Sequence, residues 1–115
     1  KYYDRVFNEI KTRFKTYNEA EICRMTSDEW FKTHNDVELD WIYIDGDHSY
    51  EGCLQDLENS LKLVKSGGLI LGDDYGWPNA KWQKTGVTKA VNEFINKHKL
   101  TQIFKHGETQ YEIRI

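Results

Sequence analysis

Hydrophobic positions recur along this chain with a helical period in several places. Near the start, apolar residues spaced by three or four positions lie among charged ones, which predicts an amphipathic helix over about residues 2–16. Two later stripes of the same period predict two longer helices. The apolar residues are Tyr3, Phe7, Ile10 and Phe14 in the first helix, Leu54, Leu57, Leu61 and Val64 in the second, and Val87, Ala90, Val91, Phe94 and Ile95 in the third.

Short apolar runs between these stripes predict β-strands. Leu39–Ile44 is apolar on both faces, which is typical of a central parallel strand covered by helices, and residues 69–71 form a second run of this kind. Residues 20–25 are a further strand candidate. Gly67-Gly68 is expected to end the helix that precedes the second run, because glycine is favoured just beyond a helix C-terminus.

Two local signals add a short helix and a hairpin. Thr26 is followed three residues later by Glu29, which is the spacing of a capping box at a helix N-terminus. Near the C-terminus, residues 103–105 and 111–115 are strand-like and flank the turn-forming sequence His106-Gly107-Glu108. The order of all these elements predicts one α/β domain over residues 1–115, with a mostly parallel sheet and antiparallel C-terminal strands.

Acidic residues follow both of the predicted central strands directly. Asp45 and Asp47 come after the first apolar run, and Asp73 and Asp74 come after the second. If the two runs are neighbouring parallel strands, four carboxylates meet at one edge of the sheet, where ligands of such sheets bind. Carboxylates about 4 Å apart repel by roughly 4 kcal/mol at an effective dielectric near 20, so the cluster requires protons, a cationic partner or a metal.

Composition narrows the classes of function. The formal net charge is -3 and the 16 basic residues are scattered among acids, so neither nucleic acid nor an anionic membrane is an expected partner. No apolar run approaches the roughly 18 residues that span a bilayer. The two cysteines, Cys23 and Cys53, are expected to be buried free thiols. Together these features favour a soluble, cytoplasmic protein.

Three segments of this sequence resemble a known family. They are Asp40 to Glu51, which reads DWIYIDGDHSYE, then Gly67 to Tyr75, which reads GGLILGDDY, and Gly86 to Val91, which reads GVTKAV. Their order and spacing are similar to those of class I S-adenosylmethionine-dependent methyltransferases. Within that class they resemble the small-molecule O-methyltransferases that use a divalent metal. The resemblance covers about residues 20–115 and implies a Rossmann-like fold and methyl transfer to a sugar, a phenol or another small hydroxylated metabolite.

The resemblance implies roles for individual residues. Asp45, Asp73 and Asp74 take the positions that hold Mg²⁺ in such enzymes. Independently of the family, three hard oxygen ligands suit Mg²⁺ better than zinc, for which His or Cys would be expected. Of the two candidates for the catalytic base, Asp47 matches the sugar O-methyltransferase branch. His48 stands where catechol-type relatives place a lysine, and Asp47 is preferred here.

The resemblance also implies residues that bind S-adenosylmethionine. Ser27 and Asp28 lie where the family contacts the adenine end of the cofactor, and Asp45 and Gly46 follow the strand that borders it. The glycine-rich turn and the ribose-binding acid of the class do not occur in this sequence. We therefore expect the chain to be the C-terminal portion of a methyltransferase domain that lacks the first strands. Such a portion is expected to bind the cofactor weakly by itself and could self-associate through an exposed sheet edge.

Several alternatives remain open from the sequence. Each acidic pair, taken alone, is equally well explained by turn and helix-cap residues. His48 is also typical of a capping or solvent-facing histidine, and Tyr75, Trp77 and Trp82 are either loop packing or an aromatic lid over the acceptor. A metal-dependent phosphoester hydrolase would use a similar carboxylate cluster, but no phosphate-binding glycine-rich loop is evident. The third alternative is a non-enzymatic interaction module.

Overall fold

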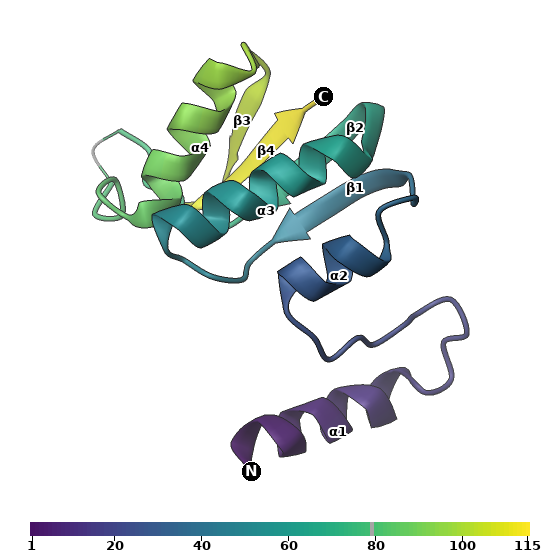
Figure 1. Cartoon of the computed structure of the whole chain (residues 1–115). Helices are drawn as coiled ribbons and strands as arrows, with labels where there is room; N and C mark the ends of the chain where they lie inside the picture. Colours follow the sequence, from purple (N-terminus) through teal and green to yellow (C-terminus); the bar gives the residue numbers. More distant parts are fainter. Residues whose placement is uncertain (79) are drawn as a thin grey trace. The chain divides into compact units, whose positions relative to one another are not determined.

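The computed structural model describes residues 1–78 and 80–115, and its contacts divide the chain into two units, Lys1–Thr33 and His34–Ile115. The first unit contains helices α1 (Tyr2–Phe14) and α2 (Ser27–Thr33). The second contains β1 (Leu39–Ile44), α3 (Tyr50–Leu63), β2 (Val64–Gly72), α4 (Gly86–Lys97), β3 (Ile103–His106) and β4 (Gln110–Arg114) (Figure 1).

Local signals placed both helices of the first unit correctly. The amphipathic helix forms as α1, and Thr26 begins α2 with the predicted capping box. In that box Thr26 N donates to Glu29 Oε2 at 2.9 Å, and Glu29 N donates to Thr26 Oγ1 at 3.2 Å. Both bonds join neighbours in sequence, which explains why the sequence alone revealed them.

The predicted strand at residues 20–25 is wrong. This segment has no regular structure and pairs with no strand among the described residues. It is anchored instead by Arg24, whose guanidinium lies 2.7 Å from Asp4 and over the ring of Phe7. Apolar character favours an extended segment, but a strand also requires a neighbouring strand to satisfy its backbone.

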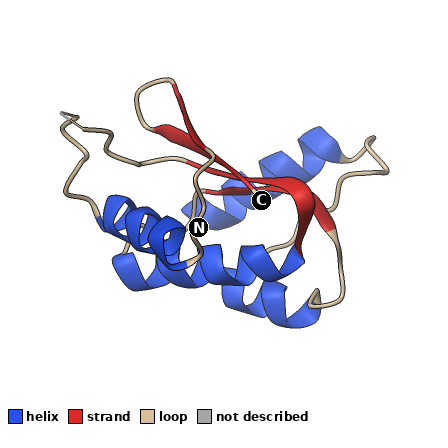
Figure 2. Ribbon diagram, turned by 90° about the horizontal axis from the view of Figure 1, so that it is seen from above, coloured by secondary structure: helices blue, strands red, loops and turns tan. Residues whose placement is uncertain are grey.

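The second unit is a four-stranded sheet in the order β1-β2-β4-β3. β1 and β2 run parallel, whereas β4 is antiparallel to both β2 and β3. The predicted α/β fold with antiparallel C-terminal strands is therefore confirmed. Figures 1 and 2 show α3 and α4 on the same face of this sheet. The tight turn between β3 and β4 confirms the hairpin.

Two details of the sheet differ from expectation. The helix that was expected to end at Gly67-Gly68 ends at Leu63, and Val64 already has extended backbone angles and pairs with Leu39. Gly67, with a φ of 82°, instead lies inside β2 where the register with β1 is irregular. In addition, β1 is an edge strand of the described sheet rather than a central one.

The core lies between the sheet and its two helices. Ile70, Tyr111 and Ile113 on the sheet are at most 1% exposed and pack against α3 and α4, which contribute Leu57, Val91 and Phe94 among others. On the opposite face of β1, Trp41 is 60% exposed and Tyr43 is 43% exposed. The side chains of β1 therefore divide between the packed face of the sheet and a face with exposed aromatic residues.

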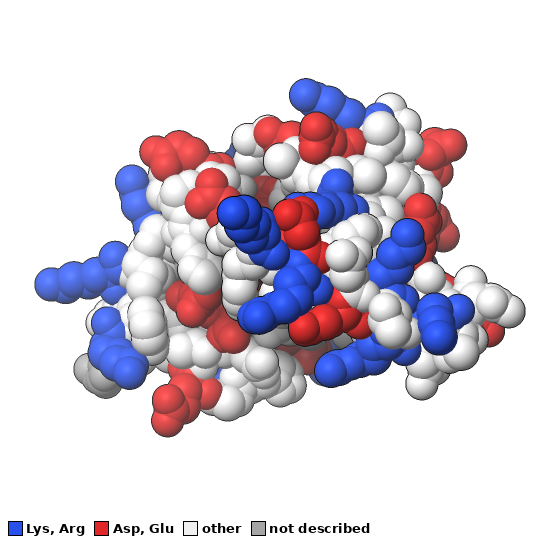
Figure 3. Space-filling model, turned by 90° about the horizontal axis from the view of Figure 1, so that it is seen from below, with Lys and Arg blue, Asp and Glu red and all other residues white. Residues whose placement is uncertain are grey.

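The surface charges, the lengths of the helices and the two cysteines bear on the expectations from composition. On the side drawn in Figure 3, basic and acidic side chains are interspersed without a broad patch of one sign. Among the described residues, no helix combines the length and the apolar character that crossing a bilayer requires. Cys53 is buried and Cys23 is partly buried, and both are free thiols. Burial raises the pKa of the Cys53 thiol to about 11, which keeps it protonated and unreactive at neutral pH.

Candidate functional site

The candidate site lies at the carboxyl ends of the two parallel strands. Ile44, the last residue of β1, pairs with Gly72, the last residue of β2. Asp45 and Asp73 therefore leave the sheet side by side, as the sequence predicted. Gly72 is required here because any side chain would collide with the ring of Tyr111 from β4. The buried aromatic ring thus fixes where the second strand ends.

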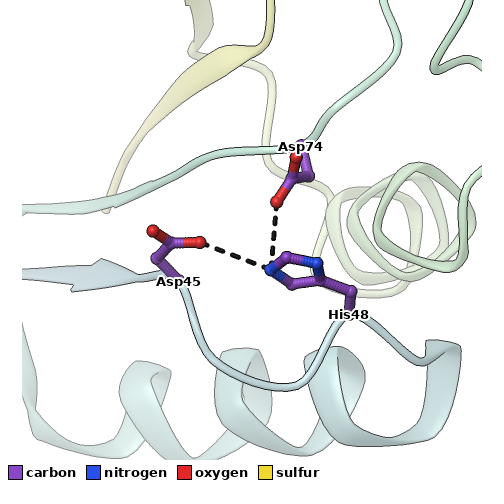
Figure 4. Close-up of side chains that lie close together, drawn as sticks. All are labelled: Asp45, His48 and Asp74. Atoms are coloured by element: carbon purple, nitrogen blue, oxygen red, sulfur yellow. Dashed lines mark hydrogen bonds and ion pairs between the residues drawn. The ribbon is translucent and has the colours of Figure 1, made fainter. Parts of the chain in front are cut away.

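Three side chains converge beyond these strand ends. His48 Nε2 lies 3.4 Å from Asp45 Oδ1 and 3.0 Å from Asp74 Oδ2 (Figure 4). The Asp45, His48 and Asp74 donor atoms all lie within 4.8 Å of one another. Asp74 reaches this position with a φ of 62°, in the left-handed region that aspartate tolerates better than most residues. We call these three residues the Asp–His–Asp cluster.

Within the described part of the chain, His48 is the only basic side chain that pairs with the two carboxylates of this cluster. Among the residues that the structure describes, neither Asp45 nor Asp74 is bridged by Lys or Arg. Two carboxylates at such a separation repel by roughly 1 kcal/mol in water and about 3 kcal/mol at an effective dielectric near 20. Burial raises the pKa of the Tyr43 phenol, and the nearby charges of Asp73, Asp45 and Asp74 raise it further. The site is therefore electronegative and accessible.

Asp73 is not a member of the cluster, and one of its carboxylate oxygens is hydrogen-bonded elsewhere. Its Oδ1 accepts hydrogen bonds from the Thr109 hydroxyl and, at 2.8 Å, from the Asp74 backbone N–H. These two bonds hold the pKa of the Asp73 carboxyl below its usual value. Asp73 thus ties the end of β2 to the β3–β4 turn. The structure brings two of the three predicted metal ligands together, and a metal-binding role for Asp73 stays a prediction.

Asp47 lies at the start of α3 rather than in the cluster. Its Oδ1 accepts a hydrogen bond from Ser49 N at 2.8 Å, and its carboxylate lies against Gly52, which leaves no space for a side chain there. The Ser49 N–H holds the pKa of Asp47 below its usual value. Asp47 is exposed and ionised at neutral pH, so it can accept a proton, but its low pKa makes it a weak base.

The loop that carries Asp74 is held by the first turn of α4. The Thr85 hydroxyl donates to the Asp74 carbonyl at 3.0 Å and accepts from Thr88 N at 3.2 Å, so it caps the helix and positions the loop together. Gly76 N donates to Thr88 Oγ1 at 2.8 Å. We did not single out these threonines from the sequence, although a threonine before a predicted helix is a recognisable N-cap signal.

Thr109 is a second residue that sequence reasoning missed. It lies in the β3–β4 turn, and its contact with Asp73 joins positions 36 residues apart in the chain. No local pattern marks such a residue. Its position depends on the antiparallel pairing of β2 with β4.

The aromatic residues after the cluster have mixed roles. Tyr75 is 7% exposed, donates to Asn92 Oδ1 at 2.7 Å and packs edge-on against Trp77, so it belongs to the core. Trp77 and Trp82 instead line a hollow of about 490 Å³, which is completed by Pro78, Ala80, Lys81, Lys105 and Glu108. Of the two open explanations, packing therefore holds for Tyr75, whereas a lid role for the tryptophans stays a prediction.

The predicted cofactor-binding residues are distributed over the two units. Ser27 and Asp28 form the first turn of α2, whereas Asp45 and Gly46 follow β1. Helix α2 is capped by Thr26, which leaves the side chains of Ser27 and Asp28 outside the capping box. A role for all four residues in binding S-adenosylmethionine stays a prediction.

Comparison with known families decides the class of protein. A family described as a methyltransferase domain matches residues 3–75, which is well over half of the chain and includes Asp45, His48 and Asp74. The chain belongs to this methyltransferase family. Among curated proteins, this chain is similar to the uncharacterised protein R132 of Acanthamoeba polyphaga mimivirus. It is 37% identical over 57 residues, which are 50% of this chain and 24% of R132.

Solved structures share the fold of this methyltransferase-family chain. The O-methyltransferase NovP superposes with a TM-score of 0.66 at 21% identity, over 93% of this chain and 43% of NovP. A Staphylococcus aureus protein provisionally assigned as a caffeoyl-CoA O-methyltransferase gives 0.64 at 17% identity, over 94% of this chain and 57% of that one. At these identities the likeness shows a common fold, and the chain spans about half the length of each structure.

The donor set of the cluster fits a divalent cation. Two carboxylates and one imidazole converge, and His48 and Asp45 are each more than half exposed, so a ligand could reach them. Carboxylate oxygens and imidazole nitrogens both bind divalent metals in proteins. The cluster contains two of the three ligands that the resemblance implies, Asp45 and Asp74, together with His48.

Proposed function

We propose that this protein is an S-adenosylmethionine-dependent O-methyltransferase that acts on a small hydroxylated metabolite, such as a sugar or a phenol. In this proposal a divalent cation assists the reaction, and by analogy with the metal-dependent O-methyltransferases that the sequence resembles, the cation is Mg²⁺. The observation that carries the proposal is the Asp–His–Asp cluster at the strand ends of a methyltransferase-family fold. If the aspartates served only as turn and helix-cap residues, the carboxylates of Asp45 and Asp74 would have no reason to lie close together.

In this proposal Asp45 and Asp74 bind the cation, and Asp73, beside them in the chain, is the third predicted ligand. A divalent cation, when bound, lowers the pKa of an acceptor hydroxyl and holds its oxygen in place. Asp47 accepts the hydroxyl proton, a task for which a weak base suffices once the hydroxyl is acidified. The acceptor oxygen then forms a bond to the methyl carbon as the carbon–sulfur bond of S-adenosylmethionine breaks, which leaves S-adenosylhomocysteine.

The proposal also assigns this chain a part of the cofactor site. Because it spans 43% of NovP and 57% of the Staphylococcus aureus structure, we propose that it forms the metal and acceptor half of a larger domain. Ser27, Asp28, Asp45 and Gly46 would contact the cofactor, and the remaining contacts would come from further sequence. A cytoplasmic location and the lack of nucleic-acid and membrane partners remain predictions.

The test is methyl transfer by the full-length protein. We expect labelled S-adenosylmethionine to methylate members of a panel of sugars and catechols when Mg²⁺ is present, and chelator to stop the reaction. Asp74→Asn should lower turnover by at least 100-fold while cofactor affinity, measured by calorimetry, stays within about threefold, because Asp74 is assigned to the cation and not to the cofactor. Asp36→Asn is the matched control because Asp36 is an exposed aspartate outside the site. Undiminished turnover in excess chelator would contradict the proposal.

A further inference from the structure

His48 is placed as a metal ligand would be. Its Nε2 lies close to one oxygen of Asp45 and one of Asp74, at 3.4 and 3.0 Å. A single ring N–H can be directed well at only one of two such acceptors. The lone pair of a neutral imidazole, in contrast, can share one cation with both carboxylates. Figure 4 shows the ring nitrogen between the two aspartates.

The separations within the cluster match those around a metal ion. With metal–ligand bonds of about 2.1 Å, adjacent ligands lie about 3.0 Å apart at a right angle and about 3.4 Å apart at a tetrahedral angle. The two distances from His48 Nε2, 3.4 and 3.0 Å, lie in this range, and all three donor atoms lie within 4.8 Å of one another. Side chains would need only small movements to bind a cation.

The backbone of His48 is fixed by two helices. Ser49 caps α3 by accepting from Gly52 N at 3.1 Å, so the residue after His48 cannot move freely. On the other side, Gly86 at the start of α4 lies so close that an added Cβ would be 2.8 Å from the His48 carbonyl oxygen. Such support on both sides is what holds a ligand in a productive position.

We propose that His48 Nε2 is the third protein ligand of this site, beside Asp45 and Asp74, and that it gives the site a preference for a first-row transition cation, such as Mn²⁺ or Co²⁺, over Mg²⁺. Imidazole is a ligand of transition metals, whereas Mg²⁺ is bound almost entirely by oxygen. This inference rests on the metal-binding part of the proposed function. It also leaves Asp47 as the proton acceptor, because a histidine bound through Nε2 has no free lone pair there.

The test measures metal binding directly in the full-length protein. Mn²⁺ binding is followed by electron paramagnetic resonance, Co²⁺ binding by its visible absorption, and Mg²⁺ binding by competition. We expect one Mn²⁺ per chain with at least tenfold higher affinity than Mg²⁺. His48→Gln should weaken Mn²⁺ and Co²⁺ binding by at least tenfold and Mg²⁺ binding by less than threefold, and should change the Co²⁺ spectrum. His106→Gln is the matched control, because His106 is also exposed and paired with a carboxylate, that of Glu112.

The outcomes separate this inference from the proposed function. The inference would be overturned by any of three results. His48→Gln could lower the affinities for Mn²⁺ and Mg²⁺ by the same factor, it could leave the Mn²⁺ affinity unchanged, or the protein could bind none of the three cations. Mn²⁺ binding through His48 without methyl transfer to any acceptor would support the inference and count against the proposed function. Metal-dependent methylation that is insensitive to His48→Gln would do the reverse.

Discussion

At the residue scale, Thr88 connects the core to the candidate site. It is 3% exposed, and its hydroxyl accepts from Gly76 N at 2.8 Å. Gly76 itself has no space for a side chain, because the backbone of Trp82 and Gln83 passes over it. The buried Thr88 hydroxyl therefore helps to fix the course of the chain after Asp74, together with the Thr85 hydroxyl. A residue that touches no reacting group can in this way position one that does.

Replacing Thr88 with valine should destabilise the protein. Valine keeps the shape but leaves the Gly76 N–H buried without an acceptor, which typically costs about 1–3 kcal/mol. Thr88→Ser keeps the hydroxyl and loses only a methyl group, so we expect it to cost less. Urea unfolding followed by circular dichroism measures both free energies. If the valine variant is as stable as the wild type, the Thr88 hydroxyl does not hold the loop.

The site was only partly predictable at this scale. Asp45, Asp73 and Asp74 could be identified because they follow the two apolar runs, and strand ends of this fold are where ligands bind. Which of these carboxylates lie together, and whether His48 joins them, could not be derived in the same way. The position of the Asp73 carboxylate depends on its hydrogen bond with Thr109. The position of His48 depends on how the N-termini of α3 and α4 pack together.

At the scale of elements, α3 and α4 are joined by an ion-pair group. Glu58 on α3 lies 2.7 Å from Lys97 Nζ and 3.0 Å from His98 Nε2 at the end of α4. Burial raises the pKa of the Glu58 carboxyl, but Lys97 and His98 lower it by more, so that it lies below its usual value of 4.5. The unfolded chain therefore binds a proton at Glu58 more readily than the folded one.

This difference predicts how stability changes in acid. The contribution of Glu58 is fully present above its unfolded pKa and is lost as the pH falls through the lower folded pKa. Glu58→Gln should therefore reduce the stability at pH 7 by about 1 kcal/mol or less and lose less stability in acid than the wild type. Thermal unfolding at several pH values measures this. Glu108→Gln, at an exposed glutamate in the hairpin turn, is the control and should follow the wild type.

At the scale of the whole molecule, the described sheet has an open edge. β1 pairs with β2 on one side, and no strand of the described residues pairs with its other side. Trp41 on this strand is 60% exposed. Unpaired N–H and C=O groups beside an exposed aromatic residue favour pairing with another strand, either from a longer chain or from a second molecule.

We expect these 115 residues, expressed alone, to self-associate. Light scattering coupled to gel filtration should give a mass well above the 13.7 kDa of one chain, increasing with concentration. Trp41→Lys should shift the population toward the monomer, because a charge on an edge strand opposes strand addition. Phe104→Lys, on the opposite edge strand β3, is the matched control. If the protein is a monomer at all concentrations, the unpaired edge of β1 does not mediate self-association.

The sequence by itself determined the helices, the two parallel strands and the family. Helical stripes and the capping box depend on contacts between residues three or four apart, and the acidic strand ends lie in contiguous motifs, so all of these are visible locally.

The tertiary structure alone decided what depends on distant partners. Residues 20–25 are not a strand because no strand in the described ranges, 1–78 and 80–115, pairs with them. Gly67-Gly68 lies within β2 because Val64 already pairs with Leu39. In the same way, Asp73 is turned to Thr109 and His48 stands between Asp45 and Asp74. Pairing between strands and packing between helices are non-local, so the direction of a side chain at the site follows from them and not from the residues beside it.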